Sequence, residues 1–195
     1  KEHGNDNLIK IINKQLPLNF YTDRKSGENH FFLCSLIRND SVEEFIQYIT
    51  INKISINSTI NQSIYETNSF LLKNENFSLI EYAAFCGSIQ IFQFLLTSGV
   101  VLEPSLWLYS IHSKNAELIH LLEYNKVELL PSLWLFAIHG KNPEIIHLLE
   151  QNEVDPEDIT YNQCYEESIK CHHNDIANYF KDNNDLIKEN ENFFI

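Results

Sequence analysis

Residues 102–155 read LEPSLWLYSIHSKNAELIHLLEYNKVE followed at once by LLPSLWLFAIHGKNPEIIHLLEQNEVD, two copies of nearly one sequence. When residues 102–128 are aligned with residues 129–155 without gaps, 18 of the 27 pairs are identical. A period of this length is typical of stacked repeat arrays, in which each unit buries its apolar face only against its neighbours. The repeat therefore predicts a stack of similar units whose function lies in the surface that it presents.

The composition limits the partners that such a stack can have. Hydrophobic residues make up 44% of the 195 residues, which excludes global disorder. The 27 acidic and 14 basic residues give a net charge of −13. A field of that sign repels phosphate backbones and anionic membrane surfaces. We therefore expect another protein as the partner, with a basic surface as the better electrostatic match, and we expect no nucleic acid.

Cysteine usage and hydropathy indicate the compartment. The chain has four cysteines without a paired framework, which suits a reducing environment: Cys34, Cys86, Cys164 and Cys171. The longest apolar run, residues 91–102, is interrupted by polar residues and is too short to cross a bilayer. We expect an intracellular, cytoplasmic protein with no signal peptide and no membrane insertion. Because the chain holds no methionine, we expect it to be part of a longer protein. We also expect a monomer.

The first fifty residues predict further helices. Apolar residues at helical spacing predict a helix over residues 5–15, and a polar loop is expected over residues 22–27. Two more helices are predicted over residues 29–38 and 42–49, joined by the turn Asn39-Asp-Ser41. This helix–turn–helix unit is a more divergent version of the twin repeats.

The stretch from residue 51 to residue 76 has no clear period. It is rich in serine and asparagine, with isolated apolar residues, and we interpret it as an irregular insertion between two repeat units. Within it, the alternation Ile54-Ser-Ile56 favours a strand or hairpin, and residues 69–73 favour one helical turn.

Several helix ends carry capping residues. Ser78 and Glu81 stand three residues apart at the start of an apolar run, which predicts a capping box. Ser105 and Ser132 precede the apolar runs of the twin units, and we expect them to accept hydrogen bonds from the first free N–H groups. The second helix of each twin unit is expected to begin at an asparagine: Asn115 in one and Asn142 in the other.

Residues 78–99, SLIEYAAFCGSIQIFQFLLTSG, resemble the ankyrin repeat, whose pattern runs Thr-Pro-Leu-His-x-Ala-Ala-x-x-Gly-His-x-x-Ile-Val-x-x-Leu-Leu-x-x-Gly. Ser78 stands at the threonine of that pattern, Ala83 and Ala84 at the alanine pair, and Gly87 and Gly99 at the two glycines. The likeness covers roughly residues 29–180. Within it, the sequence resembles the divergent ankyrin variants found in large protein families of single-celled eukaryotes.

The twin units fit the same frame. Lys114 and Lys141 fall at the position of Gly87, and Trp107 and Trp134 fall at the position of Ile80. We interpret both tryptophans as core residues between units and not as a ligand cage. The twin units are shorter than the usual length of about 33 residues. The resemblance places the missing residues in the β-hairpin finger, so long fingers are not expected.

These observations predict an all-α, ankyrin-type α-solenoid of about five helix–turn–helix repeats with shortened or absent β-hairpin fingers. An N-terminal helix and loop cap is expected over residues 1–28, the repeat array over residues 29–181 and a C-terminal tail over residues 182–195. The expected units lie near residues 29–50, 77–101, 102–128, 129–155 and 159–181.

The resemblance also indicates where a partner would bind. In ankyrin repeats, the two residues after the alanine pair face the concave groove and usually carry recognition. Here they are Ile37-Arg38, Phe85-Cys86, His112-Ser113, His139-Gly140 and Lys170-Cys171, which we call the helix-end row. The candidate partner-binding residues in this row are Arg38, Phe85, Cys86, His112, Ser113, His139, Gly140 and Lys170. The main prediction is a non-catalytic protein–protein interaction module.

Two other functions remain open. The first is a metal-binding or enzymatic domain centred on the cluster Cys164, Cys171, His172 and His173. Structural zinc sites normally use closer ligand pairs, so buried thiols are the favoured interpretation of this cluster. The sequence has no G-x-S-x-G, Walker loop, G-x-G-x-x-G or H-E-x-x-H, and we expect no enzyme activity, cofactor or metal. The second is a purely structural spacer of a longer protein.

Overall fold

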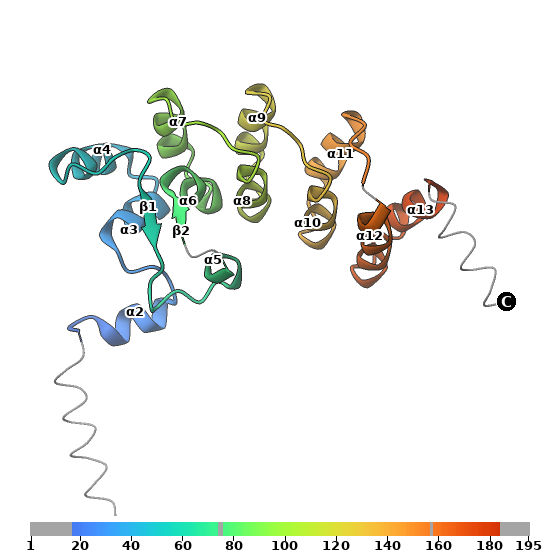
Figure 1. Cartoon of the computed structure of the whole chain (residues 1–195). Helices are drawn as coiled ribbons and strands as arrows, with labels where there is room; N and C mark the ends of the chain where they lie inside the picture. Colours follow the sequence, from blue (N-terminus) through green and yellow to red (C-terminus); the bar gives the residue numbers. More distant parts are fainter. Residues whose placement is uncertain (1–16, 74–75, 157, 184–195) are drawn as a thin grey trace, which may run out of the picture.

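The computed structural model describes residues 17–73, 76–156 and 158–183, and these residues are mostly helical (Figure 1). The helix predicted over residues 5–15 and most of the tail predicted over residues 182–195 lie outside the described residues. The predicted helical class is confirmed for the described part, with one small sheet added to it.

Ten of the helices form five consecutive pairs. They are α3 (Phe32–Arg38) with α4 (Val42–Ile51), α6 (Leu79–Cys86) with α7 (Ile89–Thr97), α8 (Leu106–Ser113) with α9 (Ala116–Tyr124), α10 (Leu133–His139) with α11 (Pro143–Gln151), and α12 (Asp158–Lys170) with α13 (Asn174–Asn183). The first helices of the pairs contact one another in the order α3, α6, α8, α10, α12. The pairs therefore lie side by side in one row (Figure 1).

Two buried tryptophans occupy equivalent places in this row. The side chains of Trp107 and Trp134 are both fully buried, so their predicted place in the core is confirmed. Each indole N–H donates to a carbonyl in the connection that follows its own pair, Trp107 to Val127 at 3.3 Å and Trp134 to Val154 at 2.8 Å. These bonds hold the connections over residues 125–132 and 152–156 against the first helices. Neither connection contains a strand.

The backbone repeats more regularly than the sequence does. Gly87, Lys114 and Lys141 lie in the turns that follow the first helices, with φ angles of 74°, 51° and 52°. Their common left-handed conformation confirms the alignment of the two lysines with the glycine. The same positive φ occurs at Asp40 and His172 in the first and last pairs. After the second helices it recurs at Lys53, Gly99, Lys126 and Glu153.

The predicted caps are confirmed in part. The hydroxyl of Ser78 accepts from the N–H of Glu81 at 3.3 Å, and the carboxylate of Glu81 accepts from the N–H of Ser78 at 2.8 Å, which completes the capping box. Asn115 and Asn142 cap α9 and α11 through their side-chain oxygens.

The prediction that Ser105 and Ser132 cap their helices is wrong. Both residues already have helical φ and ψ angles, and neither makes a side-chain cap bond. Backbone carbonyls take the first N–H groups in their place, as when Trp107 N–H donates to the carbonyl of Pro104 at 3.2 Å. The Ser105 hydroxyl donates to the Glu81 carboxylate of the preceding pair at 2.9 Å.

The loop predicted over residues 22–27 is also wrong, because α2 (Phe20–Ser26) covers most of it. The helix ends at Gly27, whose φ of 68° lets the chain leave in the left-handed conformation. The carbonyl of Gly27 accepts from both the N–H and the hydroxyl of Thr67, at 3.0 and 2.8 Å. The polar stretch therefore folds as a helix whose C-terminal end is hydrogen-bonded to the insertion.

The insertion contains a two-stranded antiparallel sheet and a short helix. Strand β1 (Thr59–Asn61) pairs with β2 (Asn76–Ser78), with Ile60 opposite Phe77, and both of these side chains are buried. The strand or hairpin predicted at residues 54–56 is wrong, because these residues form no strand and β1 begins only at Thr59. The helical turn predicted at residues 69–73 is present as α5 (Ser69–Lys73). Three-residue strands are too short for their alternation to be recognised in advance.

Candidate functional site

The helix-end row lies where the first helices end, and the packing of these helices sets its residues side by side. Of the candidate residues, His112, His139 and Lys170 are exposed. The others are half-buried: Arg38, Phe85, Cys86, Ser113 and Gly140. The row falls into three parts with different chemistry.

At the N-terminal part, Arg38 is held by the protein itself. Its guanidinium donates to the carbonyl of Asn29 and to the hydroxyl of Tyr82, both at 2.9 Å, and forms an ion pair with Glu28 at 3.1 Å. Arg38 therefore positions neighbouring segments and retains little freedom to bind a partner. A cavity of about 510 Å³ lies beside it, lined partly by Glu66, Tyr82 and Phe85.

In the central part, aromatic rings cover the row. The ring of Phe70, from α5 in the insertion, lies 6.0 Å from Phe85 in a stacked arrangement and 4.0 Å from His112, measured between ring centroids. Phe85 and His112 also contact each other at 5.7 Å. Burial, and then the charge of His139, lower the pKa of His112 below its ordinary value of 6.5. This part of the row therefore presents a neutral, aromatic surface.

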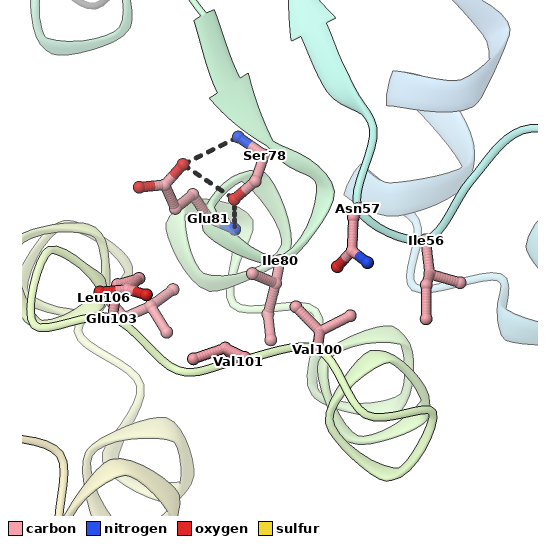
Figure 2. A pocket seen from close by; sticks show the side chains of 9 residues that line it. All are labelled: Ile56, Asn57, Ser78, Ile80, Glu81, Val100, Val101, Glu103 and Leu106. Carbon is pink, nitrogen blue, oxygen red and sulfur yellow. Dashed lines mark hydrogen bonds between the residues drawn. The ribbon is translucent and has the colours of Figure 1, made fainter.

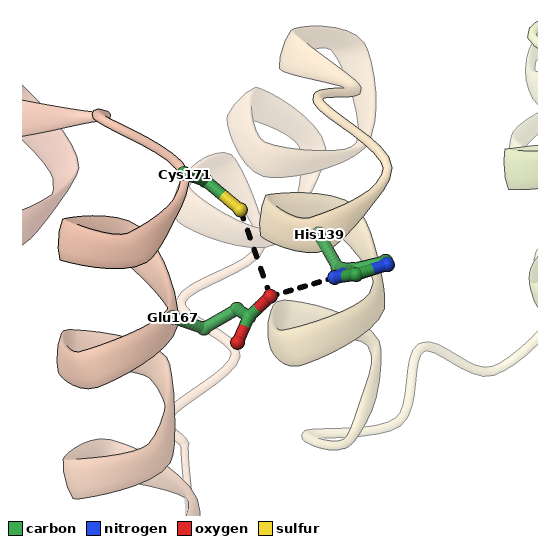
Figure 3. A group of neighbouring side chains, drawn as sticks. All are labelled: His139, Glu167 and Cys171. Carbon is green, nitrogen blue, oxygen red and sulfur yellow. Dashed lines mark hydrogen bonds and ion pairs between the residues drawn. The ribbon is translucent and has the colours of Figure 1, made fainter.

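At the C-terminal part, three side chains from neighbouring pairs converge (Figure 3). The imidazole Nδ1 of His139 lies 2.6 Å from the carboxylate of Glu167, and the thiol of Cys171 lies 3.6 Å from the same oxygen. The hydrogen bond with His139 is the main cause that lowers the pKa of Glu167. Burial, and then Glu167, raise the pKa of the Cys171 thiol.

Three further candidates in the row contact neighbouring groups of the protein: Lys170, Gly140 and Ser113. Lys170 is exposed and lies 3.6 Å from the Glu166 carboxylate and 4.0 Å from that of Glu167. Gly140 packs closely, because a Cβ atom there would lie 3.1 Å from the side chain of Ile111. Ser113 turns its hydroxyl inward and donates to the carbonyl of Ser110 at 2.9 Å.

The residues Cys164, Cys171, His172 and His173, considered as an alternative metal site, do not converge within the described part of the chain. Cys164 is fully buried, and burial raises the pKa of its thiol to about 12. Within the described residues, the one group of metal-ligand side chains that converges is His139, Glu167 and Cys171. Of the four residues in the alternative hypothesis, only Cys171 belongs to it.

Three residues that contact the helix-end row were not predicted from the sequence. Phe70 was not predicted, because the insertion has no repeat period. No sequence motif marks Glu167 as a site residue. It lies four residues before Cys171, and this spacing places both side chains on one side of α12. Tyr82 was given no role, although its hydroxyl accepts from Arg38.

A second cavity lies away from the row, next to the capping box (Figure 2). It has a volume of about 440 Å³. Its lining includes residues just before β1, residues at the start of α6 and residues of the connection that leads to α8. The polar groups around it include Ser78 and Glu81, which already satisfy each other. Its walls are otherwise largely the side chains of Ile56, Ile80 and Val100.

Acidic side chains gather on the second helices. The exposed ones there include Glu43 and Glu44 on α4, Glu117 and Glu123 on α9, and Glu144 and Glu150 on α11. Among the described helices, none combines the length and the apolar character needed to span a membrane. The chain matches no protein-family model, and no curated protein or solved structure matches it significantly.

Proposed function

We propose that the chain is an ankyrin-type array of helical pairs and acts as a non-catalytic protein–protein interaction module. The observation that carries this proposal is the recurrence of one left-handed turn at Asp40, Gly87, Lys114, Lys141 and His172, between the two helices of each pair. Equal turns in successive pairs put equivalent side chains in equivalent places, and an extended surface for binding follows from such repetition.

The central part of the helix-end row is the favoured contact surface. Phe85 and His112 form a neutral aromatic patch, and aromatic side chains are enriched where proteins bind one another. The carboxylates on the outer sides of α4, α9 and α11 surround the array with negative charge. A partner with a basic surface would be attracted by this charge, mainly through its rate of association.

A catalytic role for the row is less well supported. A cysteine nucleophile needs a lowered pKa and a base that takes its proton. The pKa of Cys171 is raised, and its thiol bonds to Glu167 instead of to His139. The arrangement therefore opposes thiolate formation in the absence of another ligand.

Affinity capture from the source cell, followed by mass spectrometry, tests the proposal. The bait is the full chain, compared with a row variant carrying Phe85→Leu, His112→Ala and His139→Ala. The matched control carries His120→Ala and His147→Ala, which remove the exposed histidines of the second helices in the same twin units. Circular dichroism verifies that each bait is folded.

We expect the row variant to lose specific partners that both the wild type and the control retain. Equal capture by the row variant would remove the helix-end row as the binding surface. If no bait captures a specific partner, the chain acts as a structural spacer and the proposal fails.

A further inference from the structure

We propose that His139, Glu167 and Cys171 form a Zn²⁺ site that joins the last two helical pairs. Each residue offers one ligand atom, and these atoms all lie within 4.8 Å of one another (Figure 3). Imidazole, thiolate and carboxylate are the three ligand types that Zn²⁺ binds in proteins, and the thiolate disfavours Mg²⁺ and Ca²⁺. This inference does not depend on the proposed interaction with another protein.

The distance between the sulfur and oxygen ligands already fits tetrahedral coordination. Zn–S bonds of about 2.3 Å and Zn–O bonds of about 2.1 Å at tetrahedral angles place sulfur and oxygen about 3.6 Å apart. The observed distance from Cys171 Sγ to Glu167 Oε1 is 3.6 Å. The same reasoning separates nitrogen and oxygen by about 3.4 Å. His139 Nδ1 is 2.6 Å from Glu167 Oε1, so this pair must open by less than 1 Å, roughly, when a metal replaces the hydrogen bond.

The geometry of α12 places two of the ligands close together. Glu167 lies in α12 and Cys171 follows its last residue, where the Cys171 N–H donates to the carbonyl of Glu167 at 2.8 Å. Side chains four residues apart in a helix are neighbours on one face, the spacing by which helices present two ligands to one metal. His139 ends α10, which packs directly against α12.

The twin unit shows that the convergence is particular to the last two pairs. His112 is the equivalent of His139, one unit earlier. At the offset of 31 that aligns α12 with α10, Glu167 and Cys171 correspond to Phe136 and Gly140. A phenylalanine and a glycine offer no ligand, so these two positions give the histidine of the earlier unit no second or third donor.

Binding changes the protonation of the site in a defined way. The Cys171 thiol loses its proton to solvent as the Zn–S bond forms, and His139 binds as neutral imidazole. The fourth coordination position is left to water. Lys170 lies 4.0 Å from Glu167 but is exposed and also pairs with Glu166 at 3.6 Å, so its ammonium can remain with Glu166 when the metal binds.

Titration of the metal-free full chain tests this site. Zn²⁺ binding is measured by competition with a chromophoric chelator, and Co²⁺ is added separately to detect a thiolate-to-cobalt charge-transfer band. We expect one Zn²⁺ per chain, at least tenfold weaker binding in each of His139→Gln, Glu167→Gln and Cys171→Ser, and loss of the cobalt–thiolate band in Cys171→Ser. Zn²⁺ should also raise the thermal midpoint of the wild type, since a ligand that binds only the folded state stabilises it.

Two matched variants serve as controls. His112→Gln removes the twin histidine. His120→Gln removes a histidine that lies 3.6 Å from Glu123 but belongs to no group of three metal-ligand side chains among the described residues. Both should bind Zn²⁺ as the wild type does. The proposal is overturned if the wild type binds no stoichiometric Zn²⁺, if the three ligand variants bind it unchanged, or if the control variants lose it to the same extent.

Discussion

Two lysines hold a backbone conformation that glycine adopts more easily, and replacing them should stabilise the protein. Lys114 and Lys141 have φ angles of 51° and 52°, at the position where α6 ends in Gly87 with a φ of 74°. The left-handed conformation costs a residue with a Cβ atom about 1–2 kcal/mol. Glycine avoids this cost but loses about 0.5–1 kcal/mol more conformational freedom on folding.

The difference predicts a net gain of about 0.5–1 kcal/mol in the free energy of unfolding for each of Lys114→Gly and Lys141→Gly. Both lysine side chains are exposed, so the substitution removes no packing. For a chain of this length, the double variant should raise the thermal midpoint by about 2–8 °C. Circular dichroism and urea denaturation measure the change.

Gly87→Ala provides the matched control. A Cβ atom there would meet its nearest neighbour, Asn115 Nδ2, at 3.4 Å, which is an ordinary contact, so its cost reports the backbone conformation alone. We expect this variant to lose stability while the lysine variants gain it. A loss of stability in both lysine variants would refute the conformational argument, and with it the equivalence of the three turns.

Three further predictions concern caps, thiols and protonation. Asn142→Ala removes the oxygen that accepts from the N–H of Ile145 at 3.2 Å and should lower the free energy of unfolding by about 1 kcal/mol in urea denaturation. In an alkylation time course followed by peptide mass spectrometry, Cys171 should react first, and Cys164 only on unfolding, because burial raises the pKa of Cys164 to about 12. Because the folded-state pKa of His112 is lowered, its neutral form is favoured by folding. Its contribution to stability is present above pH 6.5 and declines as the pH falls through 6.5 toward the lowered pKa, and His112→Gln should flatten that decline.

Much of the row of helical pairs was predictable, because the same sequence pattern occurs in both twin units. Near-identity at an offset of 27 located α8 to α11, and asparagines marked the starts of α9 and α11. Trp107 and Trp134 were correctly predicted to be buried, because a large apolar side chain in a repeated apolar stretch is usually part of the core. These inferences depend on local chemistry and on repetition, and both are written in the sequence.

The parts that escaped prediction depend on contacts between segments. Nothing near Phe70 shows that its ring will lie on Phe85 and His112, since the insertion must first fold back over α6. The contact between His139 and Glu167 depends on how closely α10 and α12 pack. The sequence does not reveal this, because the repeat offset changes from 27 to 31 between these two units. Ser105 had the residue type of a cap, but the geometry of the chain entering α8 determined its actual partner.

The central claim is that neighbouring helical pairs share one hydrophobic interior and thereby hold the helix-end row in place. Hydrogen-exchange mass spectrometry of the wild type and Trp107→Ala tests it most directly. Removing this buried indole costs about 3–5 kcal/mol. We predict that exchange protection falls together in α8 and α9 and in the neighbouring helices α10 and α11, while α3 and α4 keep theirs. A loss confined to α8 and α9, with α10 and α11 protected as before, would contradict the shared interior.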